Sequence, residues 1–248
     1  MSEDRSGSPV SISGGTAPVE LPALARFGPR VHPRGLFVTF EGIEGSGKSL
    51  QVSLLGRRLR AAGVAVVTTR EPGGTRLGKR LRSILLETAG EPVAPRAELH
   101  LYVADRIQHL LEVVEPALDR GDVVLCDRYA DATMAYQGYG RLLPLETIEE
   151  LHRRAPLGRT PARTVLLDMD PETALARARR RDERSGAASA EGRMEAESLD
   201  FHRRVREGYL EIARMEPDRF RLVPGDAAPE EVQRKVWEAV RDLFEGVE

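Results

Sequence analysis

The sequence is poor in cysteine and contains no asparagine at all. Its single cysteine, Cys126, cannot form an internal disulfide, so a reducing compartment such as the cytoplasm is the expected location. Cys126 lies within the apolar run DVVLCDR, which is typical of a buried strand. We therefore interpret this residue as a small apolar core residue rather than as a reactive thiol.

Long apolar runs and an excess of basic charge are also missing. No run of about 18 apolar residues occurs, so we expect no membrane-spanning helix and no membrane partner. The 37 basic and 39 acidic residues give a formal net charge of -2, which does not favour general binding of nucleic acid. The 248 residues, 41% of them hydrophobic, can build the core of one large domain or two small ones.

The N-terminal 34 residues differ in composition from the rest of the chain. They are rich in Ser, Gly and Pro and lack the apolar segment of a secretion signal. This composition predicts a disordered tail at 1–34, followed by a single domain at 35–248.

Within that domain, short apolar runs alternate with segments of helical periodicity. Strands are predicted at 36–42, 64–70, 122–128, 163–170 and 219–225, with helices between them. This order predicts an α/β domain of three layers, in which a five-stranded parallel sheet has helices on both faces. The segment RSGAASAEGR, 184–193, interrupts the pattern with small polar residues. It is interpreted either as a surface loop or as part of a mobile lid near 180–196.

The segment GIEGSGKS, 42–49, fits the phosphate-loop pattern G-x-x-x-x-G-K-[ST], with a predicted strand before it and a helix after it. In such a loop the backbone N–H groups hold the phosphates of a nucleotide, and Lys48 reaches its outer phosphates. Ser49 is the expected Mg²⁺ ligand. The expected nucleotide-binding residues are Gly42, Ile43, Glu44, Gly45, Ser46, Gly47, Lys48 and Ser49.

Several classes of P-loop protein can be excluded. A G-protein switch needs an NKxD segment to read guanine, and this chain has no asparagine. Helicases and transporter ATPases usually have larger bodies and further signature motifs. The remaining classes are a small kinase and a non-catalytic nucleotide-binding module.

A second cluster of charged residues follows the strand that contains Cys126. Asp127 and Arg128 end this strand, at the edge of a parallel sheet where ligands bind. There the acid could hold Mg²⁺ and the arginine an acceptor phosphate, although a simple ion pair is the alternative. Arg106 lies one helical turn after Tyr102, so the two could stack on and hydrogen-bond a base, or could be a core aromatic and a surface arginine.

Several segments together give a more specific signal than the loop alone. They are FEGIEGSGKS, TREPGGT, LYVADRIQH, DRYADATMAYQGYGR, LLDMDPE and DFHRRVREGYLEIA, in this order. In these motifs the chain, from Leu36 to its C-terminus, resembles the bacterial thymidylate kinases. The resemblance implies the P-loop NTPase fold with a five-stranded parallel sheet, transfer of a phosphoryl group from ATP to dTMP with Mg²⁺, and a homodimer.

The resemblance also implies roles for individual residues. Lys48, Asp127 and Arg128 would be catalytic, and Ser49 and Asp127 would hold the metal. Tyr102 would stack on thymine where the family usually has Phe, and Tyr136 would crowd the 2′ position of the sugar, which favours deoxyribose. The full set of implied dTMP-binding residues is Glu44, Arg70, Arg82, Tyr102, Arg106, Arg128, Thr133, Tyr136 and Gln137.

The chain departs from the family pattern in the lid. The family often has Asp before the lid arginine, whereas here Gly192 precedes Arg193. The phosphate loop contains no arginine, so a lid arginine is expected to neutralise the transferring phosphoryl group. We assign this role to Arg193, with Arg180, Arg181 and Arg184 as alternatives. Another nucleoside monophosphate kinase, a deoxynucleoside kinase or a non-catalytic regulator remain the alternative functions.

Overall fold

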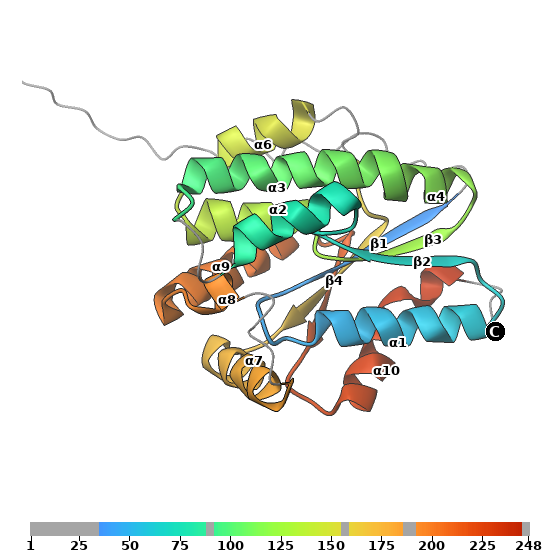
Figure 1. Ribbon diagram of the computed structural model, residues 1–248. Coiled ribbons are helices and arrows are strands. Elements are labelled where there is room, and N and C mark those ends of the chain that lie inside the picture. The colour runs from blue at the N-terminus through green and yellow to red at the C-terminus, as the bar shows by residue number, and fades with distance from the viewer. Residues whose placement is uncertain (1–34, 88–91, 155–158, 186–191, 245–248) are drawn as a thin grey trace, which may run out of the picture.

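The sheet has five parallel strands, as predicted (Figure 1). The computed structural model describes residues 35–87, 92–154, 159–185 and 192–244. The predicted N-terminal tail and the centre of the predicted lid, 186–191, lie outside the described residues. The strands run in the spatial order β2-β3-β1-β4-β5, and their bounds are β1 Leu36–Glu41, β2 Val66–Arg70, β3 Val123–Asp127, β4 Arg163–Asp168 and β5 Phe220–Pro224.

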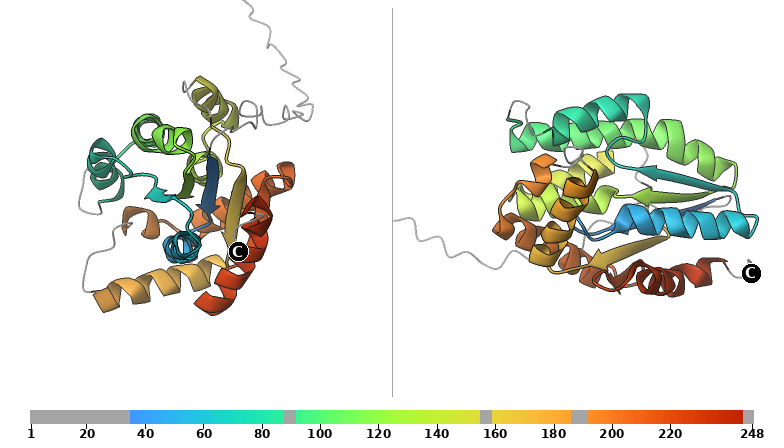
Figure 2. Two further views of the ribbon diagram at one scale, coloured as in Figure 1. Left: turned by 90° about the vertical axis from the view of Figure 1, so that its right-hand side faces the viewer. Right: turned by 60° about the horizontal axis from the view of Figure 1, so that its bottom comes forward.

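Helices lie on both sides of the sheet (Figure 2). The single long helix predicted after position 95 is divided into α3, a π-helical stretch η1 and α4. A second π-helical stretch, η2, and the short helices α5 and α8 were not predicted. The bounds are α1 Lys48–Ala61, α2 Arg76–Leu86, α3 Pro95–His109, η1 Leu110–Val114, α4 Glu115–Asp119, α5 Ala130–Thr133, η2 Met134–Gly140, α6 Leu145–Arg154, α7 Pro171–Ser185, α8 Gly192–Glu195, α9 Leu199–Met215, α10 Pro229–Val240 and a 3₁₀ turn at Arg241–Phe244.

The buried side chains alternate between the two faces of the sheet because successive residues of a strand point to opposite sides. In β1, Val38 and Phe40 pack with apolar residues of α1 and α10. Phe37, the residue before Val38, packs with Leu110 and Val114 of η1 on the other face. The strands therefore read as continuous apolar runs, as expected for a parallel sheet covered on both sides.

The order of the strands brings two motifs together. β1 and β3 are neighbours in the sheet although β2 and several helices lie between them in sequence. In this pairing Phe40 lies opposite Asp127. The backbone N–H of Arg128 donates to the carbonyl of Phe40 at 2.9 Å. The loop after β1 and the Asp-Arg pair after β3 thus meet at the carboxyl edge of the sheet, where open α/β sheets bind ligands.

Among the helices of the described residues, none combines the length and the apolar character needed to cross a membrane.

Candidate active site

The phosphate loop owes its shape to its glycines. Gly45 has a φ of +75°, and a Cβ there would come within 2.0 Å of the carbonyl oxygen of Ala174 in α7. Gly47, with a φ of +96°, immediately precedes α1 and offers no side-chain cap to it. The first N–H groups of α1 are therefore left for a ligand, and the helix dipole favours an anion there.

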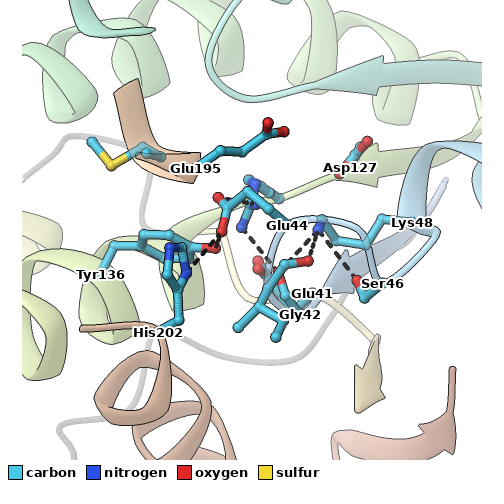
Figure 3. A network of polar contacts seen from close by, with 12 residues as sticks. Glu41, Gly42, Glu44, Ser46, Lys48, Asp127, Tyr136, Glu195 and His202 are labelled. Atoms are coloured by element: carbon cyan, nitrogen blue, oxygen red, sulfur yellow. Dashed lines mark hydrogen bonds and ion pairs between the residues drawn. The ribbon is translucent and has the colours of Figure 1, made fainter. Parts of the chain in front are cut away.

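Lys48 is the first residue of α1 and is buried. Its Nζ donates to the carbonyls of Gly42 at 3.0 Å and Ile43 at 2.8 Å, and lies 3.4 Å from Ser46 Oγ (Figure 3). These contacts keep the ammonium group over its own loop. It can exchange backbone carbonyls for phosphate oxygens with a small movement.

Ser49 and Asp127 come together beside the loop. The Ser49 hydroxyl donates to Asp127 Oδ2, and Arg70 Nη2 lies 3.1 Å from Ser49 Oγ and 3.4 Å from Asp127 Oδ2. The described residues contain no cluster of three acidic, histidine or cysteine side chains suited to a metal. A hydroxyl and one carboxylate fit Mg²⁺, which is usually held by one or two protein oxygens, water and substrate phosphates.

Arg128 links the phosphate loop to the interior of the site. Its φ of +70° is unusual for a residue with a side chain, and such conformations are concentrated at functional sites. Nη1 donates to the Gly42 carbonyl at 3.0 Å, and Nη2 donates to Glu44 Oε1 at 2.8 Å. The guanidinium also stacks over the Tyr136 ring, 4.8 Å from its centre. The side chain is thus held on three sides.

Glu44 is the acidic member of the loop and joins several elements. Its other oxygen, Oε2, accepts from the Tyr136 hydroxyl at 2.7 Å and lies 3.5 Å from Nδ1 of His202 in α9 (Figure 3). Burial raises the pKa of the Tyr136 hydroxyl well above its usual value, so this group remains a donor. The loop, β3, η2 and α9 therefore meet at one carboxylate.

A pocket opens beside this carboxylate. It is lined by most of the residues that the sequence resemblance assigns to the acceptor nucleotide, and one of them, Arg82, donates to the Pro72 carbonyl at 3.0 Å. Of the predicted dTMP-binding residues, only Arg70 does not line it. The lining residues are Glu44, Glu71, Pro72, Arg82, Leu86, Tyr102, Arg106, Arg128, Tyr129, Ala132, Thr133, Tyr136, Gln137 and Met194.

Two of the predicted lid arginines, Arg193 and Arg181, pair with groups outside the phosphate loop. Arg193 Nε donates to the Leu85 carbonyl at 2.6 Å, and its Nη2 pairs with Glu98, a buried residue of α3. Arg181 Nη2 pairs with Glu195 at 2.9 Å. The side chain of Arg184 lies outside the described residues. The described hydrogen bonds of Arg193 thus run to α2 and α3 rather than to the phosphate loop.

Sequence reasoning missed two side chains that hold Arg106. Glu71 accepts from Arg106 Nε at 2.9 Å, and His152 of α6 lies 2.8 Å from Arg106 Nη1. Glu71 lies within the TREPGG motif and could have been considered. His152 has no comparable signal, because it is one histidine in a charged helix.

Glu41, the last residue of β1, was also missed and has a testable protonation state. It accepts from the Tyr129 N–H at 2.7 Å and from the Tyr209 hydroxyl at 2.8 Å. Burial, followed by the nearby charge of Asp131, raises the pKa of Glu41 to about 8. A folded-state pKa above the unfolded value means that protonation stabilises the fold. This contribution is complete below the usual pKa of 4.5 and is lost as the pH rises through 8.

Glu41→Gln cannot titrate, so it should gain stability relative to the parent chain as the pH rises. We expect the difference in free energy of unfolding to shift by about 1 kcal/mol or more in favour of the variant between about pH 5 and about pH 8.5. Urea unfolding at the two pH values measures this. A pH-independent difference would show that Glu41 is already ionised in the fold.

The parallel sheet, the phosphate loop and the pocket beside Glu44 together define a P-loop protein of the nucleotide kinase class. A sequence model of the family described as thymidylate kinase matches residues 40–236. The chain belongs to the thymidylate kinase family, whose members phosphorylate dTMP.

Individual relatives agree with this assignment. The chain is 52% identical over 209 residues to a thymidylate kinase of Nitratidesulfovibrio vulgaris, covering 84% of this chain and 97% of that protein. It is 51% identical to a thymidylate kinase of Solidesulfovibrio magneticus, covering 84% of this chain and all of that protein. The crystal structure of thymidylate kinase from Ehrlichia chaffeensis superposes with a TM-score of 0.68 at 30% identity, covering 84% of this chain and all of that chain.

Proposed function

We propose that this chain transfers the γ-phosphoryl group of ATP to dTMP, giving ADP and dTDP, with Mg²⁺ as the metal. One observation carries the proposal. Arg128 contacts the phosphate loop through Gly42 and Glu44 and at the same time lines the pocket. A donor phosphate on the loop and an acceptor phosphate in the pocket would therefore lie on either side of one arginine.

On the donor side, the loop 42–49 would hold the ATP phosphates. The backbone N–H groups and the start of α1 would supply most of the binding, and Lys48 would follow the γ-phosphoryl group as it moves. Ser49 and Asp127 would hold Mg²⁺, which when bound neutralises phosphate charge. Arg70, which contacts both of these side chains, would hold them in position beside the metal.

On the acceptor side, Arg128 would bind the dTMP phosphate through its planar fork. Tyr102 would stack on the base, Arg106 and Thr133 would face its polar edge, and Tyr136 would pack beside the sugar. Arg82 and Gln137 would complete the wall, with Gln137 held by Glu98 Oε1 at 2.8 Å. All of these residues line the pocket.

The two phosphates repel, so the enzyme must align them and neutralise charge as the phosphoryl group moves. No strong general base is needed, because the acceptor phosphate is already a nucleophile near neutral pH. The lid cation that neutralises the transferring phosphoryl group would be Arg193. In this role its guanidinium would leave Glu98 and bind phosphate oxygens. Closure of the lid would exclude water and suppress hydrolysis of ATP.

The most direct test is an ADP-release assay with a panel of acceptors. We expect dTMP to be preferred over ribonucleotide monophosphates, other deoxynucleotide monophosphates and thymidine. Preference for another monophosphate or for a nucleoside would identify a different kinase. ATP binding without release of ADP for any acceptor would identify a non-catalytic regulator.

Tyr136→Ala should relax discrimination against ribose. The Tyr136 ring is buried, and its position is fixed by Glu44 and by Arg128 stacking on its face, so it cannot move away from an added 2′-hydroxyl. We expect the ratio of kcat/KM for dTMP to that for its ribonucleotide counterpart to fall by about tenfold or more. Tyr136→Phe, which keeps the ring, is the matched control and should retain discrimination. An unchanged ratio in the alanine variant would remove the steric argument.

We further propose that the enzyme is a cytoplasmic homodimer. The dimer is supported by the family resemblance, and the location by the single cysteine. Analytical ultracentrifugation of the full chain tests the dimer.

A further inference from the structure

Arg106 of α3 is buried, and most of its N–H groups are hydrogen-bonded to other protein groups. A guanidinium has five N–H groups: one on Nε and two on each Nη. Nε donates to Glu71 Oε2 at 2.9 Å. Nη2 donates to the Tyr129 carbonyl at 3.0 Å and to Thr133 Oγ1 at 2.8 Å. One edge of the guanidinium is thereby occupied.

The partner of Nε is itself held in place. The second oxygen of Glu71 lies 2.8 Å from Nδ1 of His109, and Nε2 of His109 lies 2.6 Å from Thr69 Oγ1. Glu71, His109 and Thr69 are all partly or fully buried. This chain of contacts ties one side of Arg106 to β2.

His152 of α6 occupies the opposite side. Its Nε2 lies 2.8 Å from Arg106 Nη1, and both residues are buried. Arginine can only donate, so the imidazole nitrogen must accept, which requires a neutral ring with its proton on Nδ1. Burial, followed by the charge of Arg106, lowers the pKa of His152 well below its usual value, so the ring stays neutral near pH 7.

Within the described residues, these contacts use four of the five N–H groups of Arg106 and leave one, on Nη1. Since the guanidinium is planar, an Nη1 hydrogen directed at His152 fixes the direction of its twin. Arg106 lines the pocket together with Tyr102 and Thr133. We propose that His152 is a positioning residue that aims the remaining Nη1 hydrogen of Arg106 at a carbonyl oxygen of the pyrimidine base.

This inference rests on the proposed function, because it requires dTMP in the pocket. It assigns to α6 a part in substrate recognition, although His152 itself does not line the pocket. Without an acceptor at this position, one buried N–H of Nη1 would lack a partner, and the plane of the guanidinium would be held from one side only. Binding of the base would then have to fix the orientation of the Arg106 guanidinium, which would weaken dTMP binding.

The test compares three variants of the full chain. His152→Leu removes the acceptor at similar size, and His152→Gln offers a carbonyl oxygen in its place. Ile148→Val, one turn earlier on the buried face of α6, perturbs packing without touching Arg106 and is the matched control. KM and kcat are measured for dTMP and for ATP, and a melting temperature is recorded for each variant.

We expect His152→Leu to raise the KM for dTMP by about 10- to 100-fold while kcat and the KM for ATP change by less than about threefold. His152→Gln should return the KM for dTMP to within about threefold of the parent value, and Ile148→Val should leave it unchanged. The inference fails if His152→Leu has a normal KM for dTMP or if His152→Gln raises this KM as much as His152→Leu does. It also fails if Ile148→Val raises the KM for dTMP to the same extent.

A measurement on the unaltered protein keeps the inference testable if a variant does not fold. In ¹⁵N NMR near pH 7, His152 should be neutral, with the proton on Nδ1 and none on Nε2. A protonated Nε2 would overturn the positioning role. Failure of the unaltered chain to phosphorylate dTMP would instead overturn the proposed function, and the NMR result would still decide the contact between His152 and Arg106.

Discussion

Arg128→Ala should lower kcat/KM for dTMP by about 10³-fold while the Kd for ATP changes by less than about threefold. The side chain supplies charge where the acceptor phosphate would lie, whereas the N–H groups that hold ATP belong to the loop. Its removal also leaves Glu44 without its ion-pair partner, 2.8 Å away, next to a second phosphate. Steady-state kinetics with dTMP and calorimetry with a non-hydrolysable ATP analogue measure the two effects.

Arg128→Lys separates charge from geometry. Lysine is a point charge and cannot contact Gly42 and Glu44 through two arms of a planar fork, so this variant should recover only part of the loss. Arg214→Ala, an exposed arginine of α9 paired with Glu211, is the matched control and should behave as the parent. Near-normal dTMP turnover in Arg128→Ala would exclude the proposed role.

Lys48→Ala should lower kcat by about 10²- to 10³-fold and weaken ATP binding as well. Lys48 is the cation closest to the loop backbone, where Nζ contacts two carbonyls, and no other lysine lies in the loop. Both phosphate binding and charge neutralisation during transfer should therefore suffer. Single-turnover rates with saturating ATP and dTMP measure the chemical step.

Lys235→Ala is the control for this variant. Lys235 lies on α10 and pairs with Glu231, so its loss removes a lysine without affecting the loop. The Lys48 variant should keep its melting temperature within a few degrees, because the carbonyls that it leaves can be solvated. A Lys48→Ala enzyme with normal single-turnover rates would show that the backbone alone stabilises the transferred group.

The phosphate loop was predictable because it is local. Its glycines, Lys48 and Ser49 all lie within eight consecutive residues, and each is required by backbone shape or by charge. The strands could be predicted as well, because buried parallel strands read as apolar runs bounded by turns. The fold expected from this pattern is confirmed by the sheet order and by the structural similarity.

The contacts that complete the pocket were not predictable in the same way. Arg106 could be read as a surface residue because its partners lie far along the chain, at Glu71 and His152. The helix α8 spans four residues, too few to show a helical period, and a lid loop was expected there. Arg193 meets Glu98 across 95 positions of sequence, a distance over which no local pattern operates.

Glu44 has a consequence for how substitutions in this site combine. One carboxylate accepts from Arg128 and from Tyr136 and belongs to the loop that begins α1. Changes at these three positions share partners, so their effects on free energy should not add, and a double variant should cost less than the sum of its parts. In thermodynamic terms Glu44, Arg128 and Tyr136 form one coupled unit, so the effect of changing one of them depends on whether the other two are intact.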